Sequence, residues 1–259
     1  MSDERPNPPF EGFPDLERLN RDVNAIKDAI LRFEASADAR DTPVSVGELC
    51  LWSVSADLVL RSNEAAAGVS ILLACGAIVP VIPLIRQVYE SVITLRYLWK
   101  QRDPQFEAQV AVAHEYARAC WVWEKLNPPG SSRAFSAEII AFRKHVDDIK
   151  AKTWALGLEA TARSVAQQHA GEGDWTGKTR LKMVEEVNGS ADEYYLFYGR
   201  LSQVSHPNVL AGGYMRNSQP EDVSRLARRT RKHLREGWSQ LVQWKLMPDP
   251  WLDEPRNGV

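Results

Sequence analysis

The chain has 259 residues, of which 44% are hydrophobic and 25% are charged, as in an ordinary globular protein that can bury a sizeable core. Its formal net charge of −2 excludes a global attraction to nucleic acids or to anionic membranes. The three cysteines are odd in number, lie far apart and form no CxxC pair, which argues against a disulfide framework and a zinc site. We expect them to be buried, reduced thiols.

The two ends of the chain are rich in proline, which predicts irregular structure there. We expect a loose N-terminal arm over residues 1–13, a helical bundle domain over 14–247 and a loose tail over 248–259. The start, MSDERPNPPF, has no basic region followed by an apolar core, so we expect no signal peptide. A cytoplasmic location follows from this and from the cysteines.

Apolar residues recur at a spacing of three to four throughout the chain, and no useful length alternates with period two. This pattern predicts an all-α protein, folded as a single irregular multi-helix bundle. The first helix should bury Leu16, Leu19, Val23, Ile26, Ile30 and Leu31. Helices are predicted over 15–34, 44–75, 81–100, 104–126, 136–168 with an interruption near Gly157, 178–187, 191–205 and 221–246.

The segment Ala65–Ile85 contains no charge over twenty-one residues, a length that could span a bilayer. Gly76 in its middle is suited to end one helix. Pro80 and Pro83 are suited to the first turn of the next, where a missing N–H costs little. We therefore predict a buried helical hairpin with its turn near residues 76–79.

Two charged residues, Arg86 and Glu90, fall on the central helix 81–100, in one stripe with Ile93 and Tyr97. A buried charge is costly unless it is paired, so we expect both to be mostly buried and Glu90 to accept a charge-assisted hydrogen bond. The pair is either an internal ion pair that fixes helix packing or a support for a functional site.

The segment around Tyr198, Arg200, Ser202 and His206 contains a second group of polar residues. Pro207 pushes His206 out of helical dihedral angles, so its imidazole lies at a helix end and can turn towards Ser202 or Arg200. Either His206 complements the helix dipole, or it forms an acid–base and phosphate-stabilising set with its neighbours.

The last helix is strongly basic and amphipathic, so its apolar side can dock on the bundle. A basic face of this kind is usually solvated or neutralised by a neighbouring helix, but it could also attract a phosphate backbone. The candidate nucleic-acid-binding residues are Arg225, Arg228, Arg229, Arg231, Lys232 and Arg235. The histidines show no ligand spacing, so we expect no metal and no cofactor.

Several blocks of sequence resemble a bacterial family of helical proteins known as a domain of unknown function. They are RSNEAA from Arg61, LLACG, LIRQVYES and YLW, then DWTGKTRLKMVEEVNG and YYLFYGRLSQVSHPNV. The resemblance covers about Leu58 to Leu210, and it implies a fold more than a function.

The spacing Arg200-x5-His206 is also similar to that of the HEPN ribonucleases, although Leu201 stands where a polar residue is usual. In that superfamily the arginine and histidine of two protomers meet at a dimer interface and cleave RNA without metal. The resemblance implies His206 as base or acid, Arg200 as the group that stabilises phosphorane charge, and Arg86 with Glu90 as orienting residues.

We therefore expect an HEPN-like protein that binds or cleaves RNA, as a homodimer, in a defence or toxin–antitoxin setting. Two other functions remain open. The chain could be a non-catalytic helical module that binds a protein partner. It could instead hold a small ligand between helices near Tyr97 and Tyr198.

Overall fold

The computed structural model describes residues 13–37, 45–127, 136–169, 175–195 and 220–243. None of these residues belongs to a β-strand, so the predicted all-α fold class is confirmed. The helices are α1 (Pro14–Ala37), α2 (Val46–Ala74), α3 (Val81–Lys100), α4 (Pro104–Leu126), α5 (Ala137–Ala155), α6 (Glu159–His169), α7 (Arg180–Asn188) and α10 (Pro220–Gln243).

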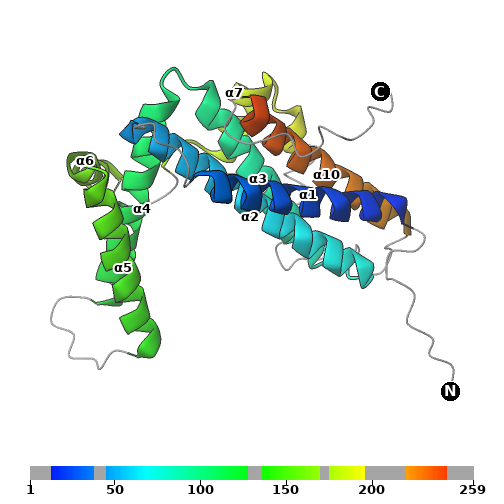
Figure 1. Ribbon diagram of the computed structural model, residues 1–259, viewed down its shortest axis with the longest axis horizontal. Coiled ribbons are helices and arrows are strands. Elements are labelled where there is room, and N and C mark those ends of the chain that lie inside the picture. Colours follow the sequence, from blue (N-terminus) through cyan, green and yellow to red (C-terminus); the bar gives the residue numbers. More distant parts are fainter. Residues whose placement is uncertain (1–12, 38–44, 128–135, 170–174, 196–219, 244–259) are drawn as a thin grey trace. The chain divides into compact units, whose positions relative to one another are not determined.

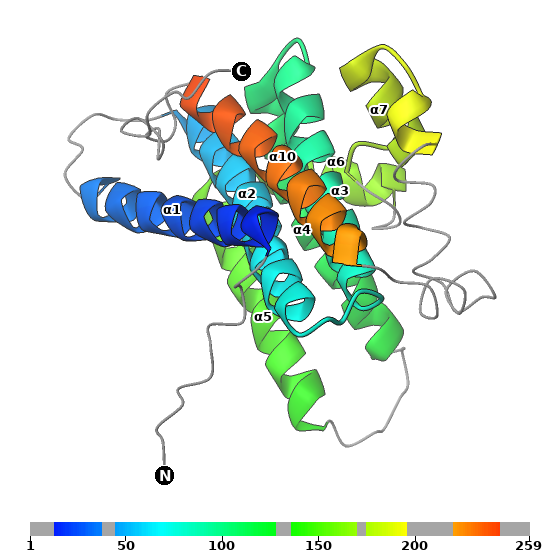
Figure 2. The same cartoon turned by 90° about the vertical axis from the view of Figure 1, so that its right-hand side faces the viewer.

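The helices are divided between two compact units, and the division falls within α2 and within α3. The first unit comprises Met1–Thr42, Ser55–Tyr97 and Arg180–Val259, and the second comprises Pro43–Val54 and Leu98–Thr179. In the first unit, α1 and α10 lie against each other although they are far apart in the sequence (Figures 1 and 2). In the second, α4 packs against α5 and α6. The boundaries 14–247 of a single domain stay a prediction.

The uncharged segment Ala65–Ile85 forms the predicted helical hairpin. Helix α2 ends at Ala74, and Gly76 adopts a left-handed backbone conformation with φ 73°. The amides of Gly76 and of the next residue donate to carbonyl oxygens in the last turn of α2, at 3.0 and 2.9 Å, which satisfies groups that a helix end leaves open. Helix α3 then begins at Val81. Within the described ranges, no helix is long and apolar enough to cross a membrane.

Two other predicted helix ends are confirmed by their capping interactions. Asp103 precedes α4, and its side chain accepts a hydrogen bond from the amide of Phe106 at 3.0 Å, with Pro104 at the first helical position. Gly157, with φ 69°, separates α5 from α6 in the same way as Gly76 separates α2 from α3. These local signals explain why the helix boundaries could be predicted.

One face of α1 is buried in the first unit. Most of the side chains predicted to line it are buried, namely Leu16, Leu19, Val23, Ile26 and Ile30. The prediction is wrong for Leu31, which is 54% exposed. At about 100° per residue, Leu31 lies roughly 60° beyond the edge of the buried arc, whereas Asp22 and Ala29 lie at its other edge and are buried.

The cysteines are all unpaired thiols, but they differ in exposure. Cys50 is buried in the second unit and Cys120 is partly buried. Cys75 is exposed, so the prediction of a buried thiol is wrong there. Its position in the turn directly after α2, next to Gly76, takes it out of the packed helix face.

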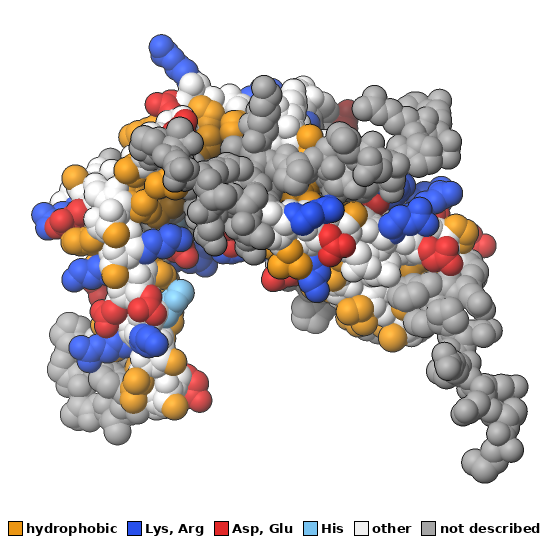
Figure 3. All heavy atoms as spheres, in the orientation of Figure 1, with side chains coloured by type: hydrophobic (Ala, Val, Ile, Leu, Met, Phe, Trp, Pro, Cys, Tyr) orange, Lys and Arg blue, Asp and Glu red, His pale blue; other side chains and the backbone are white. Residues whose placement is uncertain are grey.

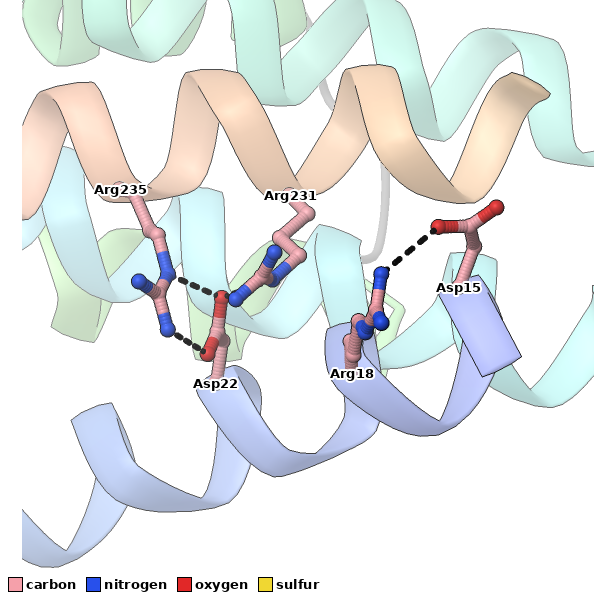
Figure 4. A network of polar contacts seen from close by, with 5 residues as sticks. All are labelled: Asp15, Arg18, Asp22, Arg231 and Arg235. Atoms are coloured by element: carbon pink, nitrogen blue, oxygen red, sulfur yellow. Dashed lines mark hydrogen bonds and ion pairs between the residues drawn. The ribbon is translucent and has the colours of Figure 1, made fainter. Parts of the chain in front are cut away.

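A buried carboxylate connects α1 to α10. The side chain of Asp22 is 1% exposed and accepts three hydrogen bonds from two arginines of α10 (Figure 4). Nε of Arg231 lies 2.7 Å from Oδ2. Arg235 binds both carboxylate oxygens, at 2.6 and 2.7 Å. A buried charge is stable only when it is paired, and bidentate pairing is directional, so Asp22 fixes the register of α1 on α10.

Replacing Asp22 by alanine should lower the free energy of unfolding by about 3 kcal/mol, because two partly buried guanidinium groups would lose their counter-ion. Urea denaturation at neutral pH measures this change. Asp28→Ala, on the exposed side of the same helix, is the matched control and should change stability by less than about 0.5 kcal/mol. Equal, small effects of both substitutions would show that Asp22 does not hold the two helices together.

Candidate functional site

The predicted pair on α3 is formed in the structure. Nε of Arg86 donates to Oε1 of Glu90 at 2.8 Å, so the expected charge-assisted hydrogen bond is present. The expectation that both are mostly buried is confirmed, since their side chains are 30% and 27% exposed, although neither is fully enclosed. The neighbouring Ile93 and Tyr97 are buried, so the pair lies at the edge of the buried face of α3. Solvent and a ligand can therefore reach it.

Polar contacts continue along α3 from this pair to α7. The hydroxyl of Thr94 donates to the backbone carbonyl of Glu90 at 2.8 Å. A guanidinium nitrogen of Arg180, at the start of α7, then donates to the Thr94 hydroxyl at 3.1 Å. Arg86 and Thr94 are two turns apart, about 12 Å along the helix. Two guanidinium groups thus lie along one side of α3, and the carboxylate of Glu90 lies between them along the helix.

A histidine of α10 lies against another side of α3. His233 is 3% exposed, and its ring meets that of Tyr89 edge to face at 5.0 Å. Its Nδ1 lies 3.2 Å from Oε2 of Glu236, one turn further along α10. A methyl group on Gly237 would stand 2.9 Å from a methyl carbon of Val92. Only glycine at position 237 lets the two helices approach so closely.

The environment shifts the pKa values of two groups around His233. Burial raises the pKa of Tyr89, and the nearby carboxylate of Glu193 adds to the effect against the opposing charge of Arg96. Burial would also raise the pKa of Glu236, but the hydrogen bond and charge of His233, with Lys232 and Arg96, lower it overall. Glu236 therefore stays ionised, and Tyr89 stays protonated, in neutral solution.

We refer to Arg86, Tyr89, Glu90, Thr94, Arg180, His233 and Glu236 as the α3 polar cluster. Its two sides suit different tasks. A carboxylate that orients an imidazole is an arrangement used in acid–base chemistry, but His233 is enclosed and serves here to join α10 to α3. Arg86 and Glu90 are partly exposed, and their side of the cluster can contact an external anion.

The predicted basic face of α10 does not point wholly outward. Arg231 and Arg235 are bound to Asp22 of α1, so the expectation that they are available to nucleic acid is wrong. The reason is the buried carboxylate on α1. Arg225, Arg228, Arg229 and Lys232 remain exposed. Arg228 makes an ion pair of 3.3 Å with Asp15, and pairs at such exposure contribute little to stability.

Four other predicted site residues, Tyr198, Arg200, Ser202 and His206, lie outside the described residues. Tyr97 is buried, at 4% exposure, on the side of α3 that carries Arg86 and Glu90. Among the described residues, no group of three or more His, Cys, Asp or Glu is placed to hold a metal ion.

Sequence reasoning missed the contacts of His233 and Asp22. The available signal was a polar residue within an apolar stripe. His233 lies between Leu226 and Leu241 on the buried side of α10, and an acid follows three residues later. Asp22 is likewise flanked by buried apolar residues of α1. Such a residue either needs a buried partner or marks a site, and the sequence does not name the partner.

We expect Glu236→Gln to reduce the amount by which the free energy of unfolding falls between neutral and acid pH. The pKa of Glu236 in the folded protein is lowered from its ordinary value of 4.5. The ionised side chain therefore contributes fully to the free energy of unfolding above pH 4.5, and this contribution is lost as the pH falls through the folded pKa. Urea midpoints measured from neutral pH to about pH 3 should show the variant less stable at neutral pH and converging with wild type in acid. Glu185→Gln, exposed on α7, is the control. A constant difference at all pH values would contradict the assignment.

Comparison with known proteins shows the family to which the chain belongs. The comparisons with curated proteins and with solved structures gave no match. A family model described as "Family of unknown function (DUF5677)" matches residues 53–222. The match includes α3, α7 and the segment with Arg200 and His206, and it ends at the start of α10. Because the match covers more than half of the chain, the protein belongs to this family of unknown function, DUF5677.

Proposed function

We propose that this protein binds RNA and cleaves it without a metal ion, in the manner of the HEPN ribonucleases. The observation that carries the proposal is the partly exposed side of the α3 polar cluster, where Arg86 and Arg180 lie along one face of α3 around Glu90. Guanidinium groups bind phosphate through several N–H donors in a planar fork. The family-matched segment contains this face together with Arg200 and His206, which supports a shared role.

In the proposed reaction His206 takes the proton from a ribose 2′-hydroxyl, and the 2′-oxygen attacks the adjacent phosphorus. The bond from phosphorus to the 5′-oxygen breaks, that oxygen receives a proton from water, and His206 afterwards returns its proton to the solvent. The products are a 2′,3′-cyclic phosphate and a 5′-hydroxyl end. Arg200 stabilises the charge that develops on the phosphoryl oxygens, while Ser202 and Tyr198 support the site.

Arg86 would contribute by orienting a neighbouring phosphate rather than by proton transfer. Glu90 holds its guanidinium in one direction through Nε, and the planar group has further N–H donors. The resemblance to HEPN proteins further implies a homodimer, in which the arginine and histidine of both copies meet. A role in defence or in a toxin–antitoxin pair belongs to the same proposal.

His206→Ala should abolish cleavage of a mixed-sequence RNA while the melting temperature stays within about 2 °C of wild type. Denaturing gels with and without a chelator measure the cleavage, and the chelator should have no effect on the wild type. His145→Ala, at an exposed histidine of α5, is the matched control and should remain active. A wild-type protein without cleavage activity, combined with a destabilised His206→Ala, would favour the non-catalytic interaction module.

RNA affinity should also depend on the outward basic residues of α10. The variant Arg228→Gln, Arg229→Gln, Lys232→Gln should bind single-stranded RNA more weakly, and the slope of log K against log salt should fall by up to about 2, because fewer counter-ions are released. Filter binding over a salt series gives the slope. The equally charged control Lys27→Gln, Arg32→Gln, Lys144→Gln alters exposed residues of α1 and α5. Identical slopes for both triple variants would remove α10 from the RNA interface.

A further inference from the structure

A cavity of about 340 Å³ lies in the second unit, between α4 and α5. This volume falls in the range of small-molecule sites, about 300–1,000 Å³. It contains no residue of the α3 polar cluster. Its lining is mixed, with aromatic, cationic, anionic and amide side chains, and consists of Tyr116, Trp123, Asn127, Arg143, Val146, Asp147 and Lys150.

One wall of the cavity is aromatic. Tyr116 and Trp123 are two turns apart on α4, and both pack at the edge of the core that joins α4 to α5. The Tyr116 ring is held by an edge-to-face contact with Trp154, at 4.9 Å between centroids. Burial, with the neighbouring thiol of Cys120, raises the pKa of Tyr116 to about 12, so its hydroxyl stays protonated. Ordered rings of this kind provide a surface on which a planar aromatic ligand can stack.

The other wall carries charge. Arg143, Asp147 and Lys150 occupy successive turns of α5 and therefore share one face. Nζ of Lys150 lies over the ring of Trp154 at 5.6 Å from its centroid, which restrains the ammonium group beside Tyr116. Among the described residues, the Arg143 side chain forms no ion pair, although Asp147 is one turn away. Figure 3 shows basic and acidic side chains side by side along α5.

We infer that this cavity binds a nucleotide unit. Its base would stack on the aromatic wall of Tyr116 and Trp123, and its phosphate would be held by Arg143 and Lys150. Asp147 would accept hydrogen bonds from the ribose hydroxyls. Two cations and one carboxylate leave a net charge of +1, which suits an anion that also carries sugar hydroxyl donors. The site goes beyond the proposed ribonuclease, because it uses neither Arg200 nor His206 and lies in the other unit.

The nucleotide could be a free monophosphate or one residue of an RNA strand, and titration calorimetry on the full chain can distinguish these sources. The probes are AMP, adenosine and octaadenylate. AMP should bind saturably at about 1 mM or below, and adenosine at least about tenfold more weakly, because it lacks the phosphate. Octaadenylate is titrated into His206→Ala, which should not cleave it, with and without Arg143→Gln. Binding that Arg143→Gln weakens by at least about tenfold identifies an RNA strand as the ligand of the cavity, whereas unchanged octaadenylate binding with weakened AMP binding identifies the free nucleotide.

Variants test the two walls separately. Arg143→Gln and Trp123→Leu should each weaken AMP binding by at least about tenfold, while Lys144→Gln, the exposed neighbour outside the lining, should leave it unchanged. Because Arg143 is exposed, its variant should keep the wild-type melting curve, which separates lost binding from lost folding. Absence of saturable AMP binding together with octaadenylate binding that Arg143→Gln leaves unchanged, or equal binding of AMP by wild type and Arg143→Gln, would overturn the inference. His206→Ala should bind AMP like wild type, so failure of the ribonuclease proposal is observed independently.

Discussion

The first unit depends on one buried carboxylate. Asp22 lies at the edge of the apolar face of α1, and the two arginines that neutralise it lie on α10, more than two hundred residues later in the chain. Each partner needs the other. Removing the carboxylate would leave two neighbouring guanidinium groups without a counter-ion, and removing the arginines would leave the buried charge of Asp22 neither paired nor hydrated. The interaction therefore has both an energetic and a geometric effect: it determines where α10 lies along α1.

That register has consequences on the opposite side of α10. His233 lies about 200° around the helix axis from Arg231, so it turns away from α1 and towards α3. There it meets Tyr89, and Gly237, one turn later, allows the close approach to Val92. The pairing of Asp22 with α10 therefore also determines where His233 and Gly237 contact α3. The Arg86–Glu90 pair lies on this same central helix, at the edge that stays accessible to solvent.

The sequence predicts most of the helix boundaries because their signals are local. Gly76, Gly157 and the Asp103-Pro104 pair each act within one helical turn, and the ion pair from Arg86 to Glu90 is a contact between neighbours on one helix. Burial is less predictable. An apolar pattern locates the buried arc of a helix only to within about one residue position, which is why Leu31 is exposed while Asp22 is enclosed. A polar residue within an apolar stripe, such as Asp22, indicates that a buried partner is needed, but no local pattern identifies a partner as distant in sequence as Arg235.

The family-matched segment includes parts of both units but leaves out two helices of the first unit almost entirely. Residues 53–222 include α3 and α7, but α1 precedes them and nearly all of α10 follows them. The two helices that Asp22 joins therefore lie almost entirely outside the matched segment, with α1 before it and α10 after it in the chain. Because Asp22 and its two arginines depend on one another, a substitution that removes the carboxylate from α1 requires a second substitution that removes the cations from α10. Such paired substitutions fall outside the matched segment and leave the sequence of α3 unchanged.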